Sequence, residues 1–352
     1  MTQRSILVTG GAGYIGSHVV LQLRERGERV VVLDDLSTGF REAVGDVPLV
    51  VGNAGDIALV KQILRDHDVD TVMHFAASIS VPDSVREPLA YYRNNTVNTR
   101  ALLEACAAHG LTQFVFSSTA AVYGMPTTGR AAESDPTAPI NPYGRSKLMS
   151  EWMLRDVAAA TSDAAATTGA TTGATTGATV KSPLRYVALR YFNVAGADHQ
   201  LRIGQALKAS FHLVHVAAEH VSGRRAHIAM FGTDYDTADG TAIRDYLHVE
   251  DLASAHLDAL AHLRAGRAST TLNVGYGHGY SVREVLDAVQ RHSERPLVIQ
   301  TGPRRAGDPP VLVAEAVRIR AELGWQPKHD DLDEIVRSAI EWEKKLRAQP
   351  WG

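Results

Sequence analysis

Short apolar runs alternate along the first half of the chain with longer stretches whose apolar residues recur at helical spacing. The runs are continuous, which is typical of strands that helices cover on both faces of a parallel sheet. The runs lie at residues 5–8, 29–33, 49–51, 71–77, 114–119 and 184–191, and the helical stretches at 15–26, 59–66, 89–108 and 143–160. This order predicts the α/β class, with a doubly wound parallel sheet.

The second half of the chain predicts a smaller unit beside that sheet. Helices are expected at about 204–222, 250–263, 282–292, 315–323 and 332–346, and strands at 226–231, 242–249, 272–274 and 297–300. We expect residues 1–192 to form the sheet domain, with 236–275 returning to it, and residues 193–235 and 276–352 to form a substrate-binding domain. An Ala-Thr-Thr-Gly repeat at 166–179 has almost no large side chains, so we expect a solvated loop there.

A glycine-rich turn between Gly10 and Gly16 follows the first strand and opens the first helix. Gly11 suits a tight turn with positive φ, Gly13 lets the backbone approach a pyrophosphate, and Gly16 lets the helix pack closely on the strand. The N–H groups and the dipole at the start of a helix favour negative charge. The turn therefore predicts a dinucleotide-binding site.

The second strand strengthens that prediction because it ends in Asp34 and Asp35. Asp34 lies 18 residues after Gly16, close to the spacing of about 20 at which an acidic residue accepts a ribose 2′-hydroxyl. A carboxylate in this place repels a 2′-phosphate. The sequence therefore favours NAD over NADP, although Arg41 lies nearby.

Composition narrows the class of protein further. The 352 residues are 45% hydrophobic and 21% charged, enough for one large or two ordinary domains. The net charge of −3 offers no basic surface for nucleic acid, and no apolar run approaches the ~20 residues of a membrane span. The one cysteine, Cys106, cannot form an internal disulfide, which fits the cytoplasm. The first strand begins almost at once, so we expect no signal peptide.

Tyr143 and Lys147 lie four residues apart at the start of a predicted helix, so they share a face. An ammonium near a phenol lowers the phenol's pKa from about 10, which makes it a usable base near neutral pH. The preceding strand ends in Ser118 and Thr119, which places hydroxyls at the same edge of the sheet. Beside a nicotinamide, such a set can remove a proton from an alcohol while hydride leaves its carbon.

These motifs resemble the extended short-chain dehydrogenases/reductases, which have a Rossmann fold, and within them the UDP-glucose 4-epimerase family. The resemblance extends over nearly the whole chain. The superfamily motifs are Val8–His18, His74–Ala77, Phe116–Gly124, Tyr143 with Lys147, and Leu189–Asn193. The motifs more particular to the epimerases are Phe231–Tyr235, Asp239–Thr241, Arg244–Tyr246 and Arg304–Asp308.

The resemblance implies a role for each matching position. Tyr143 takes the proton of the sugar 4-hydroxyl, Lys147 tunes it and holds the nicotinamide ribose, and Thr119 hydrogen-bonds the 4-oxygen. The other NAD-binding positions are Gly10, Gly13, Tyr14, Ile15, Gly16, Asp34, Asp35, Leu36, Ser37, Thr38, Gly39, Asp56, Ile57, Phe75, Ala76, Ala77, Asn94 and Phe192. The positions for the UDP-sugar are Asn193, His212, Ala229, Met230, Phe231, Arg244, Arg305 and Asp308.

The reaction implied is the reversible, NAD-dependent C4 epimerisation of UDP-glucose and UDP-galactose through a 4-keto intermediate, by a homodimer. Two alternatives stay open: a UDP-N-acetylhexosamine or UDP-pentose as substrate, and a nucleotide-sensing binding protein without turnover. A dehydratase is disfavoured because Thr119, Ala120 and Ala121 stand where that reaction requires an acid pair.

Four positions depart from the family pattern or suggest other chemistry. His212 stands where many members have an asparagine that contacts the diphosphate. Leu312 matches a position on the pocket wall. Some family members have tyrosine there, and members with broader specificity have a smaller residue, so the use of N-acetylated sugars stays open. His212, His215 and His220 spread over roughly 140° of a helix, which is too loose for one metal ion, so we predict no metal site.

Overall fold

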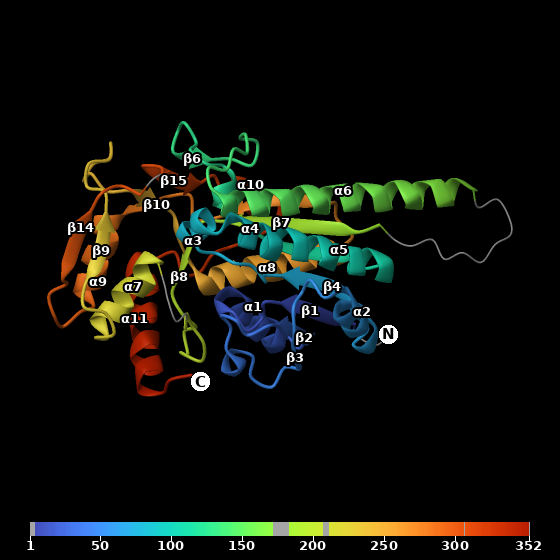
Figure 1. Ribbon diagram of the computed structural model, residues 1–352, viewed down its shortest axis with the longest axis horizontal. Coiled ribbons are helices and arrows are strands. Elements are labelled where there is room, and N and C mark those ends of the chain that lie inside the picture. Colours follow the sequence, from blue (N-terminus) through green and yellow to red (C-terminus); the bar gives the residue numbers. More distant parts are fainter. Residues whose placement is uncertain (1–3, 172–182, 207–210, 306, 352) are drawn as a thin grey trace.

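The computed structural model describes residues 4–171, 183–206, 211–305 and 307–351. Within them a seven-stranded parallel sheet has the strand order β12-β7-β5-β4-β1-β2-β3 (Figure 1). These strands are β1 (Ser5–Thr9), β2 (Arg29–Asp34), β3 (Leu49–Val51), β4 (Val69–His74), β5 (Gln113–Thr119), β7 (Arg185–Tyr191) and β12 (Thr270–Val274). The predicted α/β class and doubly wound parallel sheet are confirmed.

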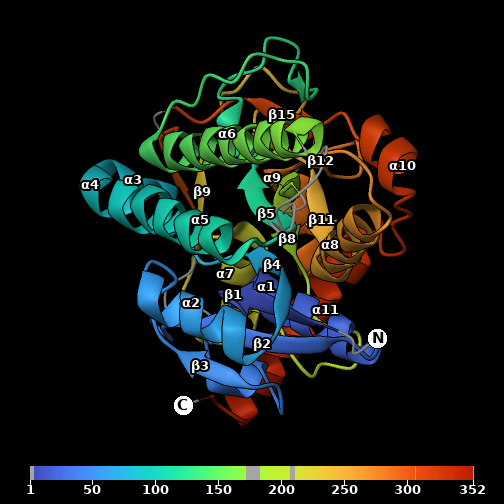
Figure 2. The same ribbon diagram turned by 90° about the vertical axis from the view of Figure 1, so that its right-hand side faces the viewer.

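Helices cover both faces of this sheet (Figure 2). On one face lie α1 (Tyr14–Glu25), α8 (Val249–Arg264) and α10 (Val317–Leu323), and on the other α2 (Ile57–Asp66), α5 (Asn98–His109) and α6 (Pro142–Thr171). Consecutive residues of β1 point into different cores: Ile6 and Val8 pack with Val19 of α1, whereas Leu7 packs with Leu64 of α2. Because both faces are buried, the strand reads as a continuous apolar run.

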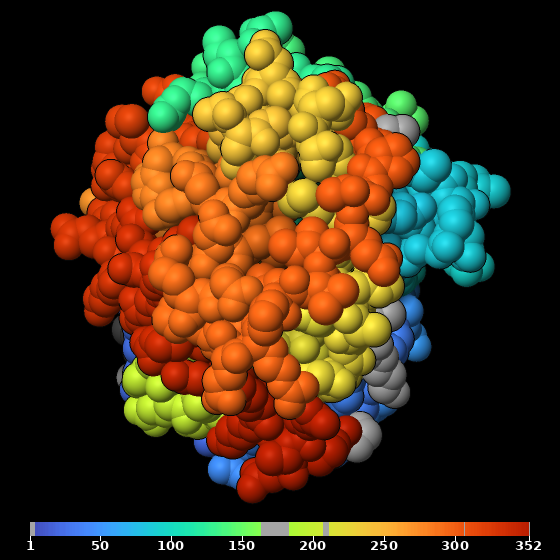
Figure 3. Space-filling view, turned by 90° about the vertical axis from the view of Figure 1, so that its left-hand side faces the viewer, coloured from blue at the N-terminus to red at the C-terminus, as the bar shows by residue number. Residues whose placement is uncertain are grey.

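A smaller part of the structure lies beside the carboxyl ends of the parallel strands. Its sheets have the orders β13-β10-β15-β6, β14-β9 and β11-β8. Figure 3 shows this side of the molecule, formed mostly by residues from the second half of the chain, coloured yellow to red. Its elements are β6 (Arg130–Ala131), β8 (Asn193–Ala195), α7 (Leu213–Val221), β9 (Ile228–Phe231), β10 (Ile243–Arg244), β11 (Tyr246–His248), β13 (Tyr280–Ser281), α9 (Val282–Arg291), β14 (Ile299–Gly302), β15 (Val311–Ala314) and α11 (Leu332–Ala348).

Short helical segments complete the chain: η1 (Arg41–Ala43), α3 (Val81–Arg86), α4 (Pro88–Tyr91), η2 (Tyr92–Val97) and η3 (Ala120–Val122). The predicted helix at 89–108 is therefore three segments, of which η2 is π-helical. None of the helices in the described residues is long and apolar enough to cross a membrane.

The structure also differs from the prediction at residues 166–171 and at the start of the helix expected at 204–222. Helix α6 continues to Thr171, so the loop predicted at 166–179 is wrong for residues 166–171, and residues 172–179 lie outside the described part. Half of residues 166–179 are threonine and three are glycine, which are weak helix formers, but extending an existing helix is cheaper than starting one. The helix expected at 204–222 begins only at Leu213, because the backbone of His212 is extended.

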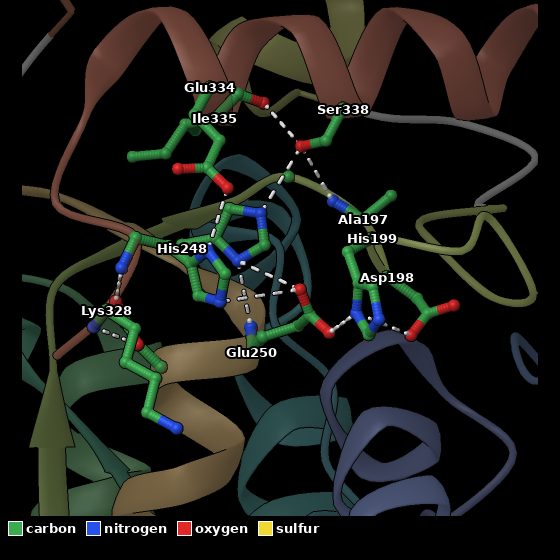
Figure 4. A network of polar contacts seen from close by, with 12 residues as sticks. Ala197, Asp198, His199, His248, Glu250, Lys328, Glu334, Ile335 and Ser338 are labelled. Atoms are coloured by element: carbon green, nitrogen blue, oxygen red, sulfur yellow. Dashed lines mark hydrogen bonds and ion pairs between the residues drawn. The ribbon is translucent and has the colours of Figure 1, made fainter.

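A polar cluster joins α8, α11 and the segment after β8 (Figure 4). The His248 Nε2 atom lies 3.3 Å from Ser338 Oγ of α11, and Ser338 Oγ also accepts a hydrogen bond from the Ala197 N–H at 3.2 Å. The Glu250 carboxylate contacts His199 Nδ1 at 2.9 Å. These contacts fix the backbone that follows Asn193, one of the predicted substrate residues.

Candidate active site

The carboxyl ends of the central strands open onto one cavity of about 1570 Å³. It lies where the strand order reverses between β1 and β4, the usual ligand position in open α/β sheets. Of the predicted cofactor set, those lining the cavity are Gly10, Gly13, Tyr14, Ile15, Gly16, Asp34, Asp35, Leu36, Ser37, Thr38, Gly39, Phe75, Ala76, Ala77, Asn94, Thr119, Tyr143 and Phe192. All eight predicted substrate residues and Leu312 also line it.

Three predicted residues, Asp56, Ile57 and Lys147, are not part of that lining. The Asp56 carboxylate caps α2 by accepting hydrogen bonds from the backbone N–H groups of Ala58 and Leu59, at 3.0 and 3.1 Å. Its Oδ1 atom is therefore directed at the helix start.

In the glycine turn, Gly10 rather than Gly11 has the positive φ, +72°, so the prediction for Gly11 is wrong. A Cβ atom on Gly11 would come within 2.8 Å of Val32, so tight packing accounts for this glycine. At Gly16 a Cβ atom would lie 2.2 Å from the Gly10 carbonyl oxygen, which agrees with the close helix–strand contact that we predicted.

Asp34 lies at the end of β2 beside this turn. Its carboxylate accepts hydrogen bonds from the Ala12 and Leu36 N–H groups, each at 2.9 Å, and burial raises its pKa. The bonds hold both oxygens in place, and each oxygen keeps a further lone pair for a ribose hydroxyl.

Tyr143 is brought beside Thr119 by the packing of α6 on the end of β5. A Cβ atom on Gly144 would lie 2.5 Å from the Ala121 carbonyl oxygen, so only glycine permits this approach. The Tyr143 phenol hydrogen-bonds the Thr119 side chain, and both residues line the cavity. Tyr143 and Thr119, which the sequence predicts as a proton-transfer pair, therefore lie together at the cavity.

The charges around Tyr143 differ from the expectation. Burial, with a smaller effect of Tyr191, raises the pKa of Tyr143 above its ordinary value, and the hydrogen bond to Thr119 opposes this. The Lys147 ammonium instead donates to the Ser117 carbonyl oxygen at 2.8 Å, and burial lowers the pKa of Lys147 to about 7. Desolvation disfavours the charged form of both groups, so proximity alone does not produce the predicted phenolate.

The substrate side of the cavity carries two arginines. The Arg305 guanidinium lies over the Phe231 ring, 4.2 Å from its centroid. The Arg244 guanidinium donates to the Asp308 carboxylate and to the Pro309 carbonyl oxygen, the latter at 2.7 Å. Planar guanidinium groups suit a diphosphate, and the contacts hold these two in place.

The three histidines considered for metal binding face different partners. His212 caps α7, with its Nδ1 atom 2.8 Å from Gln205 Nε2, and burial lowers its pKa to about 4. His215 lies 3.4 Å from the Glu343 carboxylate. His220 donates through Nδ1 to a backbone carbonyl and accepts at Nε2 from the Val298 N–H at 3.1 Å. The neutral His212 is thus a cavity-lining hydrogen-bonding group.

With this geometry established, comparison with known proteins decides the family. The sequence profile of the "NAD dependent epimerase/dehydratase family" matches residues 6–275. The chain belongs to the NAD dependent epimerase/dehydratase family.

Individual relatives agree with this assignment. The UDP-glucose 4-epimerase of Azospirillum brasilense is 54% identical over 97% of this chain and 92% of its own. The crystal structure of UDP-glucose 4-epimerase from Brucella ovis in complex with NAD superposes with a TM-score of 0.88, at 39% identity, covering 97% of this chain and 98% of that one. The UDP-Glc/GlcNAc 4-epimerase of Campylobacter jejuni has a TM-score of 0.80 at 45% identity, covering 97% and 99%. The resemblance inferred from the motifs is confirmed.

The structure of this epimerase/dehydratase family member shows a polar network that the sequence did not predict. The Arg190 guanidinium pairs with the Glu151 carboxylate, with Nη2 2.6 Å and Nε 3.0 Å from its oxygens. Ser118 Oγ donates to the same carboxylate, and Arg190 also donates to the Tyr123 hydroxyl at 3.0 Å. Glu151 stands four residues after Lys147, a spacing that suggests a shared helix face.

A second unpredicted group comes from the π-helical segment η2. The Asn95 amide accepts a hydrogen bond from the Ser78 N–H at 2.8 Å and donates to Ser146 Oγ at 3.0 Å. It thereby ties the loop after β4 to the helix that carries Tyr143. π-Helical turns are frequent at functional sites, but they leave little trace in the hydrophobic pattern.

Proposed function

We propose that this chain is a UDP-glucose 4-epimerase that interconverts UDP-glucose and UDP-galactose with bound NAD. The observation that carries the proposal is one cavity that combines the glycine turn and Asp34, the Tyr143–Thr119 pair, and the arginines Arg244 and Arg305. A dinucleotide, an alcohol and a diphosphate are the ligands that suit these groups. The 54% identity to a UDP-glucose 4-epimerase supports the same reaction.

The residues present fit NAD. The start of α1 faces the cavity where a pyrophosphate is favoured, and the Asp34 carboxylate is positioned for the adenosine ribose. The position of Asp34 disfavours a 2′-phosphate. NAD, when bound, accepts hydride from C4 of the sugar and returns it.

The protein's own chemistry in this proposal is a proton transfer. The proton of the sugar 4-hydroxyl moves to the Tyr143 oxygen as hydride leaves C4, while Thr119 hydrogen-bonds the 4-oxygen. The 4-keto sugar then turns about its pyrophosphate link, and the proton returns to the oxygen after hydride has entered from the other face. No electrons are gained or lost overall. Burial raises the pKa of Tyr143, so a nearby ammonium is needed to stabilise the phenolate form. Lys147, one helical turn away, is the residue that we propose for this.

The decisive experiment uses the purified protein with UDP-galactose and no added cofactor. Formation of UDP-glucose without a net rise in absorbance of reduced nicotinamide is expected. Turnover of only a UDP-pentose or a UDP-N-acetylhexosamine would change the substrate and keep the mechanism. If NAD is bound but no UDP-sugar reacts, the nucleotide-sensor alternative replaces the proposal.

A second substrate, UDP-N-acetylglucosamine, is supported by Leu312 on the cavity wall and by the UDP-Glc/GlcNAc 4-epimerase among the structural neighbours. Replacing Leu312 by the bulkier tyrosine should lower kcat/KM for the N-acetylated sugar about tenfold relative to UDP-glucose, because the acetamido group needs that space. Leu312→Met conserves the volume and should keep the wild-type ratio. An unchanged ratio in Leu312→Tyr would remove this residue from the specificity argument.

We also infer the division into domains predicted from the sequence. β12, which pairs with β7 in the large sheet, and α8, which packs against α1, support the return of the later part of 236–275. β10, within 236–275, and β6, within 1–192, pair instead with β15 of the smaller part. Limited proteolysis with and without NAD tests this division. If the division is right, each unit should yield its own protease-resistant fragment.

We further propose a homodimer in the cytoplasm. The side chains of Val97, Met149 and Trp152 on η2 and α6 are exposed and apolar, as is typical of a helical subunit interface. Light scattering measures the mass in solution, and a monomer would contradict the dimer.

The single cysteine, Cys106, is buried, which fits a reducing compartment such as the cytoplasm. Fractionation of cells tests that location.

A further inference from the structure

Glu151 lies on α6, one turn beyond Lys147, and connects three elements behind the Tyr143–Thr119 pair. Its carboxylate accepts from Ser118 Oγ on β5 and from the Arg190 guanidinium on β7, whose Nη2 atom lies 2.6 Å away. Glu151 and Arg190 are each only 7% exposed. This is a buried pair with several charge-assisted hydrogen bonds, a geometry that restricts movement.

The end of β5, which pairs with β7 as far as Thr119, is also tied to α6 by contacts of three residues. Ser117 offers its carbonyl oxygen to the Lys147 ammonium at 2.8 Å, Ser118 is held by Glu151, and Thr119 hydrogen-bonds Tyr143. Three consecutive residues are therefore tied to α6, and Glu151 anchors the middle one. A shift of this strand end would displace both the hydroxyl of Thr119 and the acceptor of Lys147.

We infer that Glu151 is a positioning residue for the epimerase reaction: anchored by Arg190, it holds the Ser117–Thr119 end of β5 in register with Tyr143 and Lys147. The inference rests on the proposed function and adds a residue that does not touch substrate or cofactor. Glu151 is absent from the lining of the cavity, so its effect must pass through the groups that it holds.

The charge of Glu151 also acts on Lys147. Burial lowers the pKa of Lys147 to about 7, and the Glu151 carboxylate opposes this shift. Without that carboxylate, the ammonium would lose its proton at lower pH. Glu151 of α6 and His74 of β4 are the charged or titratable groups that interact electrostatically with Lys147. On β7, Arg190 contacts Glu151 and Tyr191 contacts Ser117, while Tyr143 lies one turn before Lys147 on α6. Burial and the Lys147 charge lower the pKa of His74 to about 3, so His74 stays neutral over the working range.

The test compares wild-type protein with Glu151→Gln, which keeps the shape of the side chain and removes its charge. The chain has seven lysines, so the titration of Lys147 can be followed by NMR with isotope-labelled lysine and assigned with Lys147→Met. We expect the Lys147 midpoint to fall by about one pH unit. With UDP-galactose, kcat should fall about 10–100-fold near pH 8 while KM stays within about twofold, because the reacting groups are misaligned rather than the substrate lost.

Asp156→Asn on the exposed side of α6 is the matched control and should leave both measurements unchanged. Glu151→Asp retains the charge and shortens the side chain, so it should keep the Lys147 midpoint near the wild-type value and still lower kcat. It also serves as the test if Glu151→Gln does not fold.

An unchanged Lys147 midpoint and an unchanged kcat–pH profile in Glu151→Gln would overturn the inference. A lower unfolding temperature with full activity below it would show a purely structural ion pair and overturn it as well. Lack of turnover in the wild-type protein would refute the proposed function, and the Lys147 titration would then decide the role of Glu151 alone.

Discussion

Tyr143→Phe is expected to lower kcat for UDP-galactose by about 10²–10⁴-fold, the usual contribution of a general acid–base group. Phenylalanine fills the same buried space beside Thr119 but has no oxygen to receive the proton of the sugar 4-hydroxyl. Because the arginines on the substrate side are untouched, KM should stay within about twofold. Steady-state kinetics with the amount of bound NAD measured in parallel gives both values.

Tyr92→Phe is the matched control for this variant. Tyr92 is the first residue of η2 and is not among the cavity-lining residues. It should retain the wild-type rate. A Tyr143→Phe protein with bound NAD and nearly full activity would show that another group accepts the proton.

Arg190→Met is expected to lower the free energy of unfolding by about 3–5 kcal/mol. The substitution leaves the Glu151 carboxylate buried without its ion pair, and an uncompensated buried charge is far more costly than the loss of a surface pair. Urea unfolding followed by circular dichroism, at a fixed NAD concentration, measures the change.

The double variant Arg190→Met/Glu151→Met separates the cost of the lone charge from the net value of the pair. It should recover most of the lost stability, since it removes both charges together. Arg155→Met, at an exposed pair with Asp156, should change stability by less than about 1 kcal/mol. Equal losses in Arg190→Met and the double variant would mean that packing, rather than charge, stabilises this region.

Much of the fold could be predicted from the sequence because it depends on residues that are close together in the chain. The apolar runs of the central strands, the glycine turn and Asp34 are defined by residues close together in the chain, and the structure places them as a parallel sheet around one cavity. The four-residue spacing of Tyr143 and Lys147 likewise put them on one helix face. Local rules were less reliable at element ends, as the continuation of α6 to Thr171 shows.

What the sequence by itself determined was therefore the sheet, the glycine turn after β1 and the set of groups that we propose to react. Only the tertiary structure decided the environment of those groups. The pairing of Glu151 with Arg190 joins residues 39 positions apart, and Gly10, which has the positive φ, lies so close to Ala76 that a Cβ atom would come within 2.5 Å of its nitrogen. The pKa of Tyr143 rises because it is buried, and burial is a property of the packed chain, since it depends on which distant segments exclude water from a side chain.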